Sequence, residues 1–255
     1  MARRPRLDMA GYHHVVNRGV ARSNIFTSSA DKDKFLQILC KACKLYDVIV
    51  HDYCLMDNHY HLLLETKQEN LSLMMRQLNS YYAIYFNKKE NRVGHLWQGR
   101  FRSWYVLNED YLYLLFRYIE SNPIKANLSN KIGEYPYTLS AALFGNSEIV
   151  SCAKGSILIH DFSPQTLIEF LETELSEEES NALNEEQKRK ISVENEDIKI
   201  ARSKTLYEHF NDVTSKQERN NAIISAFKDG HTQGSIAKHL NLSTGLICGI
   251  IKSED

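Results

Sequence analysis

Two histidines stand two residues apart in an apolar run from Cys54 to Glu65, which reads CLMDNHYHLLLE. Side chains at positions i and i+2 of a β-strand point to the same face, so His59 and His61 should face one space while Tyr60 faces the other way. Imidazole is the commonest metal ligand in proteins, and two on one face supply half of a metal site. The same spacing would also arise in a strand whose polar face happens to carry two histidines without a metal.

A third ligand and a nucleophile are offered by the segment YLYLLFRYIESNPIKAN. Tyr118 and Asn122 are four residues apart, so in a helix they share one face. The amide oxygen of Asn122 is a hard ligand suited to Mg²⁺ or Mn²⁺, and the phenol of Tyr118 can attack a phosphate polarised by that metal. The phenol has an ordinary pKa of about 10, so the site must help it lose its proton. The alternative is a core tyrosine followed by an ordinary helix end before Pro123.

A zinc hydrolase is another enzyme class that could use the same pair of histidines. It would need a carboxylate base nearby, and Glu65 lies four residues after His61 on the same nominal face. We expect Glu65 to fall past the end of the strand, which makes this class the less favoured one.

The elements that must position these residues follow from hydrophobic periodicity. The pattern predicts strands over 12–17, 48–56 and 59–65, with a tight Asp57-Asn58 turn, and helices over 31–46, 70–87 and 109–121. Bulky residues alternate over 95–107 around Gly99, which predicts a strand, a bend and another strand. The order β-α-β-β-α-β indicates the α+β class, with a ferredoxin-like antiparallel sheet and helices packed on it.

Composition is typical of a globular protein, with 43% hydrophobic and 25% charged residues among 255. No apolar run approaches the roughly 20 residues that span a bilayer, and the basic N-terminus lacks the apolar core of a secretory signal. We therefore expect no membrane contact and a cytoplasmic location. Five cysteines do not predict a disulfide framework; Cys40 and Cys43 are interpreted as buried helix residues, and Cys54, Cys152 and Cys248 are assigned no chemistry.

Charge is distributed unevenly along the chain, although the net charge is −1. Residues 1–145 carry 19 Lys and Arg against 13 Asp and Glu, and residues 146–198 carry 4 against 13. The remaining residues carry 8 against 6. This pattern predicts a catalytic domain over 1–147, an acidic and largely helical linker over 148–200, and a second domain over 201–255.

The second domain reads as three short helices around a small apolar core, from QERNNAIISAF to GLICGIIK. It is similar to the helix-turn-helix domains of bacterial regulators, with the pattern TQ-x-x-IA-x-x-L-x-LS. Its reading helix departs from that pattern, because Gly245 and Gly249 stand where polar side chains usually meet base edges. Thr244 and Lys252 are the candidate DNA contacts that remain, and a module for phosphate contacts or protein association is the alternative.

The motifs of residues 12–145, taken in order, resemble the single-tyrosine HUH transposases, which include insertion-sequence transposases and REP-associated tyrosine transposases. The motifs are YHHVVNRGV, SNIF, HDYCLMDNHYHLLLE, GHLWQGRFRS, YIESNPIKANL and YPYTLSAALFG. The resemblance implies that His59, His61 and Asn122 bind Mg²⁺ or Mn²⁺ and that Tyr118 is the nucleophile. Family members often have proline at the position of Asp57, a turn position where little effect is expected.

The resemblance further implies that Tyr118 cleaves single-stranded or hairpin DNA through a covalent 5′-phosphotyrosine, and that strand joining reverses this step. It also allows a homodimer, and a DNA substrate implies association with the nucleoid. The rival interpretation is a DNA-binding regulator with a non-catalytic HUH domain. The better candidates for phosphate contacts are Arg100 and Arg102. Further candidates, each of which could equally be an ordinary surface charge, are Arg18, Arg22 and Lys125.

Trp97 and Phe101 stand close to Arg100 and Arg102 in the sequence, and we expect both aromatic side chains to lie mostly in the core. His13 and His14 are consecutive, so only one of them can face the side of the sheet that carries the two metal-binding candidates. The sequence assigns neither of them a role.

Overall fold

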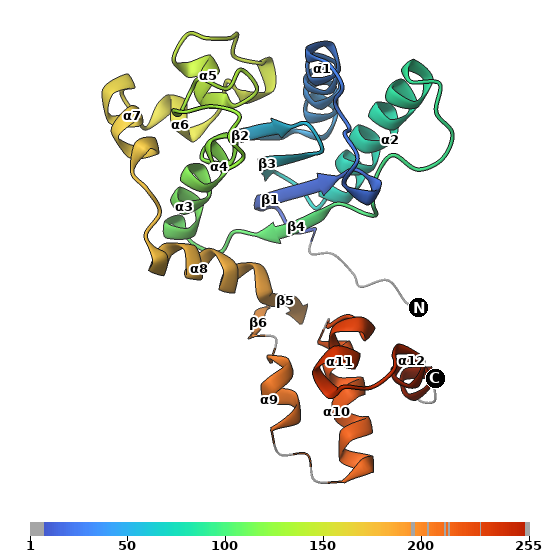
Figure 1. Ribbon diagram of the computed structural model, residues 1–255. Helices are drawn as coiled ribbons and strands as arrows, with labels where there is room; N and C mark the ends of the chain where they lie inside the picture. Colours follow the sequence, from blue (N-terminus) through green and yellow to red (C-terminus); the bar gives the residue numbers. More distant parts are fainter. Residues whose placement is uncertain are drawn as a thin grey trace. The chain divides into compact units, whose positions relative to one another are not determined.

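The computed structural model describes residues 8–194, 197–202, 204–211, 213, 215–229 and 231–252. The chain divides into two compact units, residues 1–187 and 188–255 (Figure 1). The first contains all the residues proposed for catalysis, and the second contains the predicted helix-turn-helix.

The first unit is built on a four-stranded sheet in the order β2-β3-β1-β4, and every pairing is antiparallel. Along the chain the elements alternate as predicted, so the α+β class and the ferredoxin-like arrangement are confirmed. The elements are β1 (Gly11–Arg18), α1 (Ser29–Tyr46), β2 (Val48–Met56), β3 (His59–Thr66), α2 (Leu71–Lys89) and β4 (Arg102–Tyr105).

Local sequence explains where these elements begin and end. Ser28 caps α1 through a capping box with Asp31, and Asp47 ends the helix in the left-handed conformation. The strands β2 and β3 meet at the Asp57-Asn58 turn, so that Met56 pairs directly with His59. A register shift between Val50 and Asp52 marks a bulge in β2.

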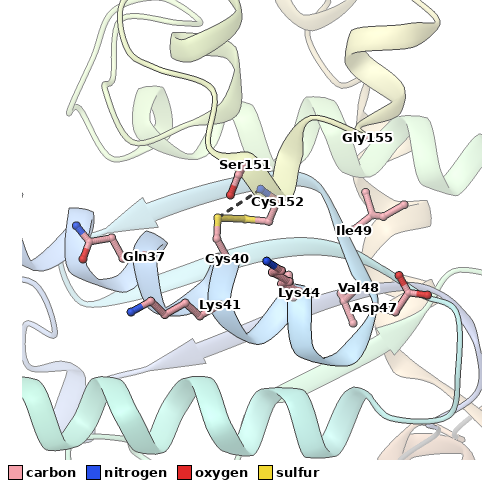
Figure 2. Close-up of a pocket in the computed structure, with 11 residues that line it drawn as sticks. Gln37, Cys40, Lys41, Lys44, Asp47, Val48, Ile49, Ser151, Cys152 and Gly155 are labelled. Atoms are coloured by element: carbon pink, nitrogen blue, oxygen red, sulfur yellow. Dashed lines mark hydrogen bonds between the residues drawn. A yellow bond between two sulfur atoms is a disulfide. The ribbon is translucent and has the colours of Figure 1, made fainter.

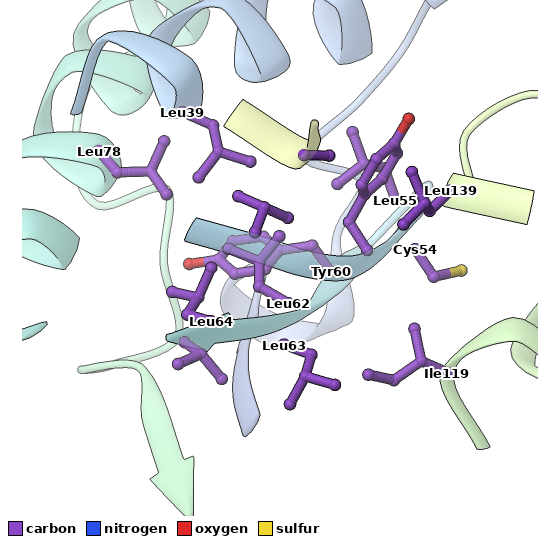
Figure 3. Packing of buried hydrophobic residues seen from close by; sticks show 14 of the residues in the cluster. Leu39, Cys54, Leu55, Tyr60, Leu62, Leu63, Leu64, Leu78, Ile119 and Leu139 are labelled. Atoms are coloured by element: carbon purple, nitrogen blue, oxygen red, sulfur yellow. The ribbon is translucent and has the colours of Figure 1, made fainter. Parts of the chain in front are cut away.

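The sheet separates two layers of side chains. Leu62 and Leu64 point to the face covered by α1 and α2, whereas Leu63 points to the opposite face, toward Ile119 (Figure 3). The three leucines and Ile119 are fully buried, and burial of each such side chain contributes about 1.5 to 3 kcal/mol to the stability of the fold. This alternation assigns each residue of β3, including the two histidines, to one layer.

The helix that carries the candidate nucleophile is α3 (Glu109–Glu120), followed by the short α4 (Asn122–Lys125). The side chain of Asn108 caps α3 by accepting a 2.8 Å hydrogen bond from the backbone N–H of Tyr111. Pro123 follows at the start of α4, as the predicted helix end requires. Downstream, Thr138 caps α5 (Leu139–Leu143).

The prediction of two strands over 95–107 is wrong for the first of them. Only Arg102–Tyr105 forms a strand, and Trp97 makes an isolated bridge with Gly19. The bulky residues alternate there because they anchor a loop: Phe101 is buried, and the indole N–H of Trp97 donates to the Asn79 carbonyl at 2.9 Å. Both aromatic residues belong to the core, as expected.

The acidic region of the first unit is helical. The unit contains the short 3₁₀ turns η1 (Val20–Arg22), near the N-terminus, and η2 (Ser151–Ala153), followed by α6 (Ile157–His160), α7 (Pro164–Glu172) and α8 (Glu177–Lys188). Arg117 of α3 forms an ion pair with Glu179 of α8, and its guanidinium lies 5.9 Å from the ring centre of Phe170 in α7. These contacts attach the acidic helices to the helix of the candidate nucleophile.

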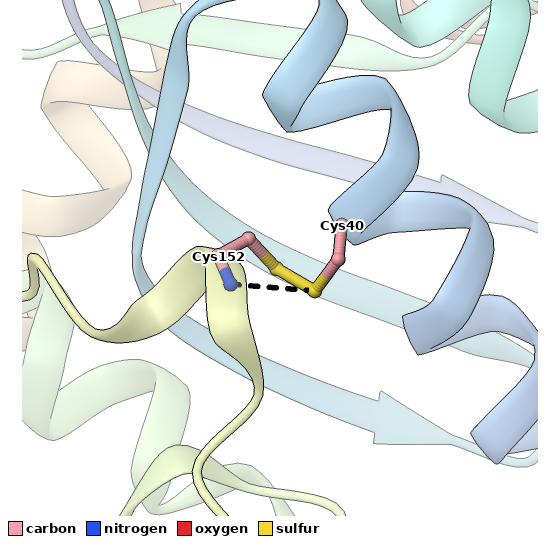
Figure 4. Close-up of a disulfide and its surroundings, with 2 residues drawn as sticks. All are labelled: Cys40 and Cys152. Carbon is pink, nitrogen blue, oxygen red and sulfur yellow. Dashed lines mark hydrogen bonds between the residues drawn. A yellow bond between two sulfur atoms is a disulfide. The ribbon is translucent and has the colours of Figure 1, made fainter.

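A disulfide joins Cys40 of α1 to Cys152 of η2, with the two Cα atoms 4.9 Å apart (Figure 4). The prediction that the cysteines form no disulfide and that Cys40 is merely a buried helix residue is therefore wrong. The cause is a long-range contact, because the chain around Cys152 returns to α1 after 112 residues. Cys43, Cys54 and Cys248 are free, and the first two are buried.

The second unit begins with a hairpin and continues with short helices. These are β5 (Arg189–Glu194), β6 (Asp197–Arg202), α9 (Leu206–Phe210), α10 (Lys216–Lys228), α11 (Gln233–Leu240) and α12 (Thr244–Lys252). Ile223, Ile236 and Ile247 are fully buried in its core. Thr232 caps α11, and Asn241 makes the turn in the left-handed conformation, so the predicted helices α10 to α12 are present.

Within the described ranges, no helix is long and apolar enough to cross a membrane.

Candidate active site

The two histidines of β3 face α3 rather than α1 and α2. His61 pairs with Val16 of β1, and His59 pairs with Arg18. Because alternate residues share a face, His59, His61 and Leu63 point to the α3 side together with Arg18. The expectation that Tyr60 points away from them is met, since Tyr60 is buried against Phe35 of α1.

Both imidazoles make a polar contact through Nδ1, so Nε2 is the nitrogen of each ring that could face a metal ion. The ring centres of His59 and His61 are 5.1 Å apart. Nδ1 of His59 lies 2.6 Å from the amide oxygen of Asn58, and Nδ1 of His61 lies 3.0 Å from Nε2 of His14. Burial lowers the pKa of His59, and it lowers the pKa of His61 well below its usual value, with the neighbouring histidines adding to the effect. Both rings are therefore neutral near pH 7, the form that binds a metal.

Tyr118 lies against this pair. Its ring meets the ring of His61 edge to face, with the centres 5.6 Å apart. The side chain is half-buried, and burial raises the pKa of the phenol, so an acceptor must take the proton when the oxygen reacts. The ammonium of Lys125 lies 5.2 Å from the ring centre of Tyr118, which puts a positive charge beside the candidate nucleophile.

Asn122 is oriented by the helix end that precedes it. Its Nδ2 donates to the carbonyl of Tyr118 at 2.7 Å and to that of Ile119 at 3.2 Å, so its Oδ1 remains as the ligand atom. The described residues contain no group of three or more His, Cys, Asp or Glu that could hold a metal. A site here must accordingly combine the two imidazoles with a different donor, and an amide oxygen fits a hard cation such as Mg²⁺ or Mn²⁺.

A basic cavity of about 300 Å³ opens near these residues on β1 and the segment before β4. Three of the five candidate phosphate contacts line it: Arg18, Arg100 and Arg102. Trp104, which also lines it, stacks on His14 with ring centres 5.3 Å apart. Arg18 pairs with His59 across the strands and Trp104 contacts His14, so the cavity lies next to the candidate ligands, although neither His59 nor His61 lines it.

The other candidates are separate from this cavity. Arg22 is exposed in the loop after β1, and its carbonyl lies 3.5 Å from the Asn58 amide nitrogen. Thr244 and Lys252 are the first and last residues of α12 in the second unit. The expectation that Glu65 falls past the strand end is wrong, because β3 runs to Thr66. The Glu65 carboxylate is instead paired with His51, at 3.0 Å, and with Lys67. It is therefore not a base beside His59, which disfavours the zinc hydrolase.

A second cavity, of about 720 Å³, lies at the disulfide between α1, the start of β2 and η2 (Figure 2). Lys41 and Lys44 flank it, and Ile49 and Gly155 close its other side. Neither His59 nor His61 lines this cavity, so it is separate from the candidate metal ligands.

Sequence reasoning missed two groups: one touches the candidate site, and the other anchors the helix that carries Tyr118. His14 contacts both His61 and Tyr118, and the only signal was that one of two consecutive histidines must face that side. Glu120, on the opposite side of α3 from Tyr118, accepts hydrogen bonds from Ser140 and lies beside Asp52. No spacing in the sequence connects residues 52, 120 and 140.

Solved structures with partial likeness to the chain include two transposases. A REP-associated tyrosine transposase bound to a REP hairpin is 17% identical, covers 60% of this chain and 92% of its own, and gives a TM-score of 0.47. A putative transposase from Deinococcus radiodurans is 17% identical, with 48% and 97% covered and a TM-score of 0.34. The tRNA(His) guanylyltransferase of Saccharomyces cerevisiae is 14% identical, with 69% and 77% covered and a TM-score of 0.35.

Comparison with curated protein sequences gave no match. The model of the family described as "Transposase IS200 like" matches residues 9–122. That segment runs from the start of β1 to Asn122 and includes His59, His61 and Tyr118. The domain built around the four-stranded sheet therefore belongs to the IS200-like transposase family.

Proposed function

We propose that this transposase is a metal-dependent endonuclease and strand transferase for single-stranded DNA, acting at hairpin sites through a covalent 5′-phosphotyrosine. The observation that carries the proposal is the contact between the ring of Tyr118 and the ring of His61, with Asn122 one helical turn later. Tyr118 and His61, which come from distant parts of the chain, thereby lie in contact, and we infer that His59 and Asn122 complete the metal site.

In the proposed reaction, the phenol oxygen of Tyr118 forms a bond to phosphorus, and the bond from phosphorus to the 3′ oxygen breaks. The phenol proton passes to an acceptor, and the departing strand takes up a proton as its 3′-OH forms. His59, His61 and Asn122 would hold a Mg²⁺ or Mn²⁺ ion, which would polarise the scissile phosphate. Attack by a free 3′-OH on the phosphotyrosine reverses these bond changes and joins the new strand.

The cationic side chains around the site would bind the DNA backbone. Arg18, Arg100 and Arg102 line a cavity on the same face as the histidines, and Lys125 lies over the ring of the nucleophile. Several positive charges on one face suit a backbone with one phosphate per nucleotide. Trp104 offers a ring on which an unpaired base can stack. Arg22, which is exposed outside this cavity, would be a separate phosphate contact.

We further propose that the catalytic domain covers residues 1–147, the acidic linker 148–200, and a DNA-binding module 201–255. This module would bind duplex DNA through Thr244 and Lys252 at the two ends of α12. Gly245 and Gly249 leave that helix with little polar surface between them, so phosphate contacts should outweigh base contacts. A homodimer and a location at the nucleoid in the cytoplasm complete the proposal.

The test is a denaturing gel of the full chain with labelled single-stranded hairpin oligonucleotides and Mn²⁺. The unmodified protein should give a slow-migrating covalent adduct that EDTA prevents, and Tyr118→Phe should give none. Tyr113→Phe is the matched control, because Tyr113 lies on the same helix and packs against Phe170 instead of the histidines.

The outcomes separate the alternatives. An adduct that persists in Tyr118→Phe would assign the nucleophile to another tyrosine. If no adduct forms across a broad oligonucleotide pool while the protein binds duplex DNA tightly, the chain is a DNA-binding regulator and not a nuclease.

A further inference from the structure

His14 of β1 lies at the centre of the site and has no role in the function proposed above. It is fully buried, and its Nε2 lies 3.0 Å from Nδ1 of His61. Its ring is nearly parallel to that of His61, at 16° and with centres 5.3 Å apart, and it stacks on Trp104 on β4. It also meets the ring of Tyr118 edge to face at 5.9 Å. One side chain thus contacts a metal-binding candidate and the nucleophile.

The hydrogen bond between the two imidazoles can be made in two ways. If Nδ1–H of His61 donates to Nε2 of His14, then Nε2 of His61 has a free lone pair that can bind a cation. If Nε2–H of His14 donates instead, His61 carries its hydrogen on Nε2 and cannot bind a metal there. The direction of this hydrogen bond therefore decides whether His61 is a ligand.

The first arrangement has a consequence for the other nitrogen of His14. Its Nδ1 then carries a hydrogen, and in the described part of the chain that buried atom has no partner. A buried N–H without an acceptor costs stability. A leucine of similar size would avoid this cost, so the presence of histidine at this position points to a role in the site.

We propose that His14 is a positioning residue that accepts the hydrogen bond from Nδ1–H of His61 and so directs Nε2 of His61 toward the metal. Trp104 and Tyr118 hold the ring of His14 in place on its other sides. Partners of this kind fix the tautomer and orientation of a metal-binding histidine, and their loss weakens metal affinity about 10- to 100-fold. The inference rests on the proposed metal site.

Mn²⁺ affinity of the full chain, measured by isothermal titration calorimetry, tests the proposal. His14→Leu should weaken binding about 10- to 100-fold. His14→Gln should stay within a few-fold of the unmodified protein, because its amide oxygen can accept from Nδ1–H of His61. His13→Leu is the matched control: His13 is equally buried, but its Nε2 lies 2.8 Å from the carbonyl of Met9 and its ring meets Tyr105, so Mn²⁺ binding should not change.

The proposal is overturned if His14→Leu binds Mn²⁺ as tightly as the unmodified protein, or if His14→Gln is as weak as His14→Leu. A second measurement does not need the metal or a variant. Long-range ¹⁵N–¹H NMR spectra of the metal-free protein should show His61 with its hydrogen on Nδ1, and a hydrogen on Nε2 would refute the proposal.

The two proposals fail in different ways. If His61→Ala binds Mn²⁺ as tightly as the unmodified protein, the metal site of the proposed function is wrong. The NMR result then still decides whether His14 sets the tautomer of His61.

Discussion

Asp52→Asn should stabilise the first unit, and by more as the pH rises. Asp52 and Glu120 are both fully buried and lie side by side between β2 and α3. Glu120 accepts a 2.8 Å hydrogen bond from the backbone N–H of Ser140 and another from its hydroxyl. Oδ1 of Asp52 accepts from the N–H of Tyr53 at 2.8 Å, whereas no described residue donates to its Oδ2. A single proton held between the two carboxyl groups would give Oδ2 of Asp52 a hydrogen-bond partner on Glu120.

The proton belongs on Asp52. Burial raises the pKa of Asp52 well above its usual range, and the adjacent Glu120 adds to this effect. Burial also raises the pKa of Glu120, but the two hydrogen bonds from Ser140 oppose the increase by favouring its charged form. Protonated Asp52 can then donate to the carboxylate of Glu120, and in the Asp52→Asn variant the new side-chain amide would donate in the same way.

The sign of the pH effect follows from proton uptake. In the unfolded chain Asp52 loses its proton near its ordinary pKa of about 3.9, whereas the folded protein keeps it. The stability contributed by the raised pKa is present below that pH and is lost as the pH rises through the folded pKa. One proton limits the loss to about 1.4 kcal/mol per pH unit. Asp52→Asn removes this loss, so its advantage over the unmodified protein should grow from pH 5 upward.

The measurement is the free energy of unfolding in urea at pH 5, 6, 7 and 8, followed by tryptophan fluorescence. Both tryptophans, Trp97 and Trp104, lie in the first unit, so the signal reports on that unit. Asp110→Asn is the control for the loss of a carboxylate, because Asp110 is exposed on the same helix α3. If Asp52→Asn destabilises the protein equally at every pH, Asp52 is ionised in the folded state and the reasoning is refuted.

Three further outcomes are expected. Cys152→Ser should lower the free energy of unfolding by about 4 to 5 kcal/mol, because Cys40 and Cys152 close a loop of 112 residues; the comparison is with the oxidised protein in urea, and equal stability would contradict it. Asn122→Ala should weaken Mn²⁺ binding at least about tenfold and Asn122→Asp should not, since a carboxylate is also a hard oxygen donor; calorimetry separates them. Arg102→Ala should weaken single-stranded DNA binding and reduce the salt slope of the logarithm of the binding constant by about 0.7, and an unchanged slope would remove Arg102 from the phosphate contacts.

Much of the fold could be predicted because its strongest signals are local. The hairpin of β2 and β3 is bounded by a two-residue turn, and the observed β2 has the predicted bounds, Val48–Met56. The helix α3 begins after an Asn cap and ends before Pro123, and both signals are in the sequence. The loop before β4 has the pattern of a strand because Trp97 and Phe101 alternate as strand residues do, although each is packed into the core for its own reason.

The site could be predicted where it is local and not where it depends on register. His59 and His61 share a face by strand geometry alone, and Tyr118 and Asn122 share one by helix geometry. Which of His13 and His14 joins them depends on the pairing of β1 with β3, and a shift of one residue would exchange the two. The disulfide is a long-range contact of the same kind, since neither Cys40 nor Cys152 carries a local signal for the other.

The two layers of the first unit differ in a way that bears on function. The layer under α1 and α2 buries apolar side chains of the sheet such as Leu62 and Leu64, with His13 and Asn17 as polar exceptions, whereas the α3 layer buries His14, Asp52 and Glu120. Buried ionisable groups cost stability unless each finds a partner, so an apolar α3 layer would be the more stable choice. Glu120 instead anchors α3 by two hydrogen bonds from Ser140 on one side of the helix, while Tyr118 contacts His61 on the other. Directional hydrogen bonds restrict the rotation of a helix about its axis more than apolar contacts do. The proposed attack of Tyr118 in line with a phosphate would require such a restriction.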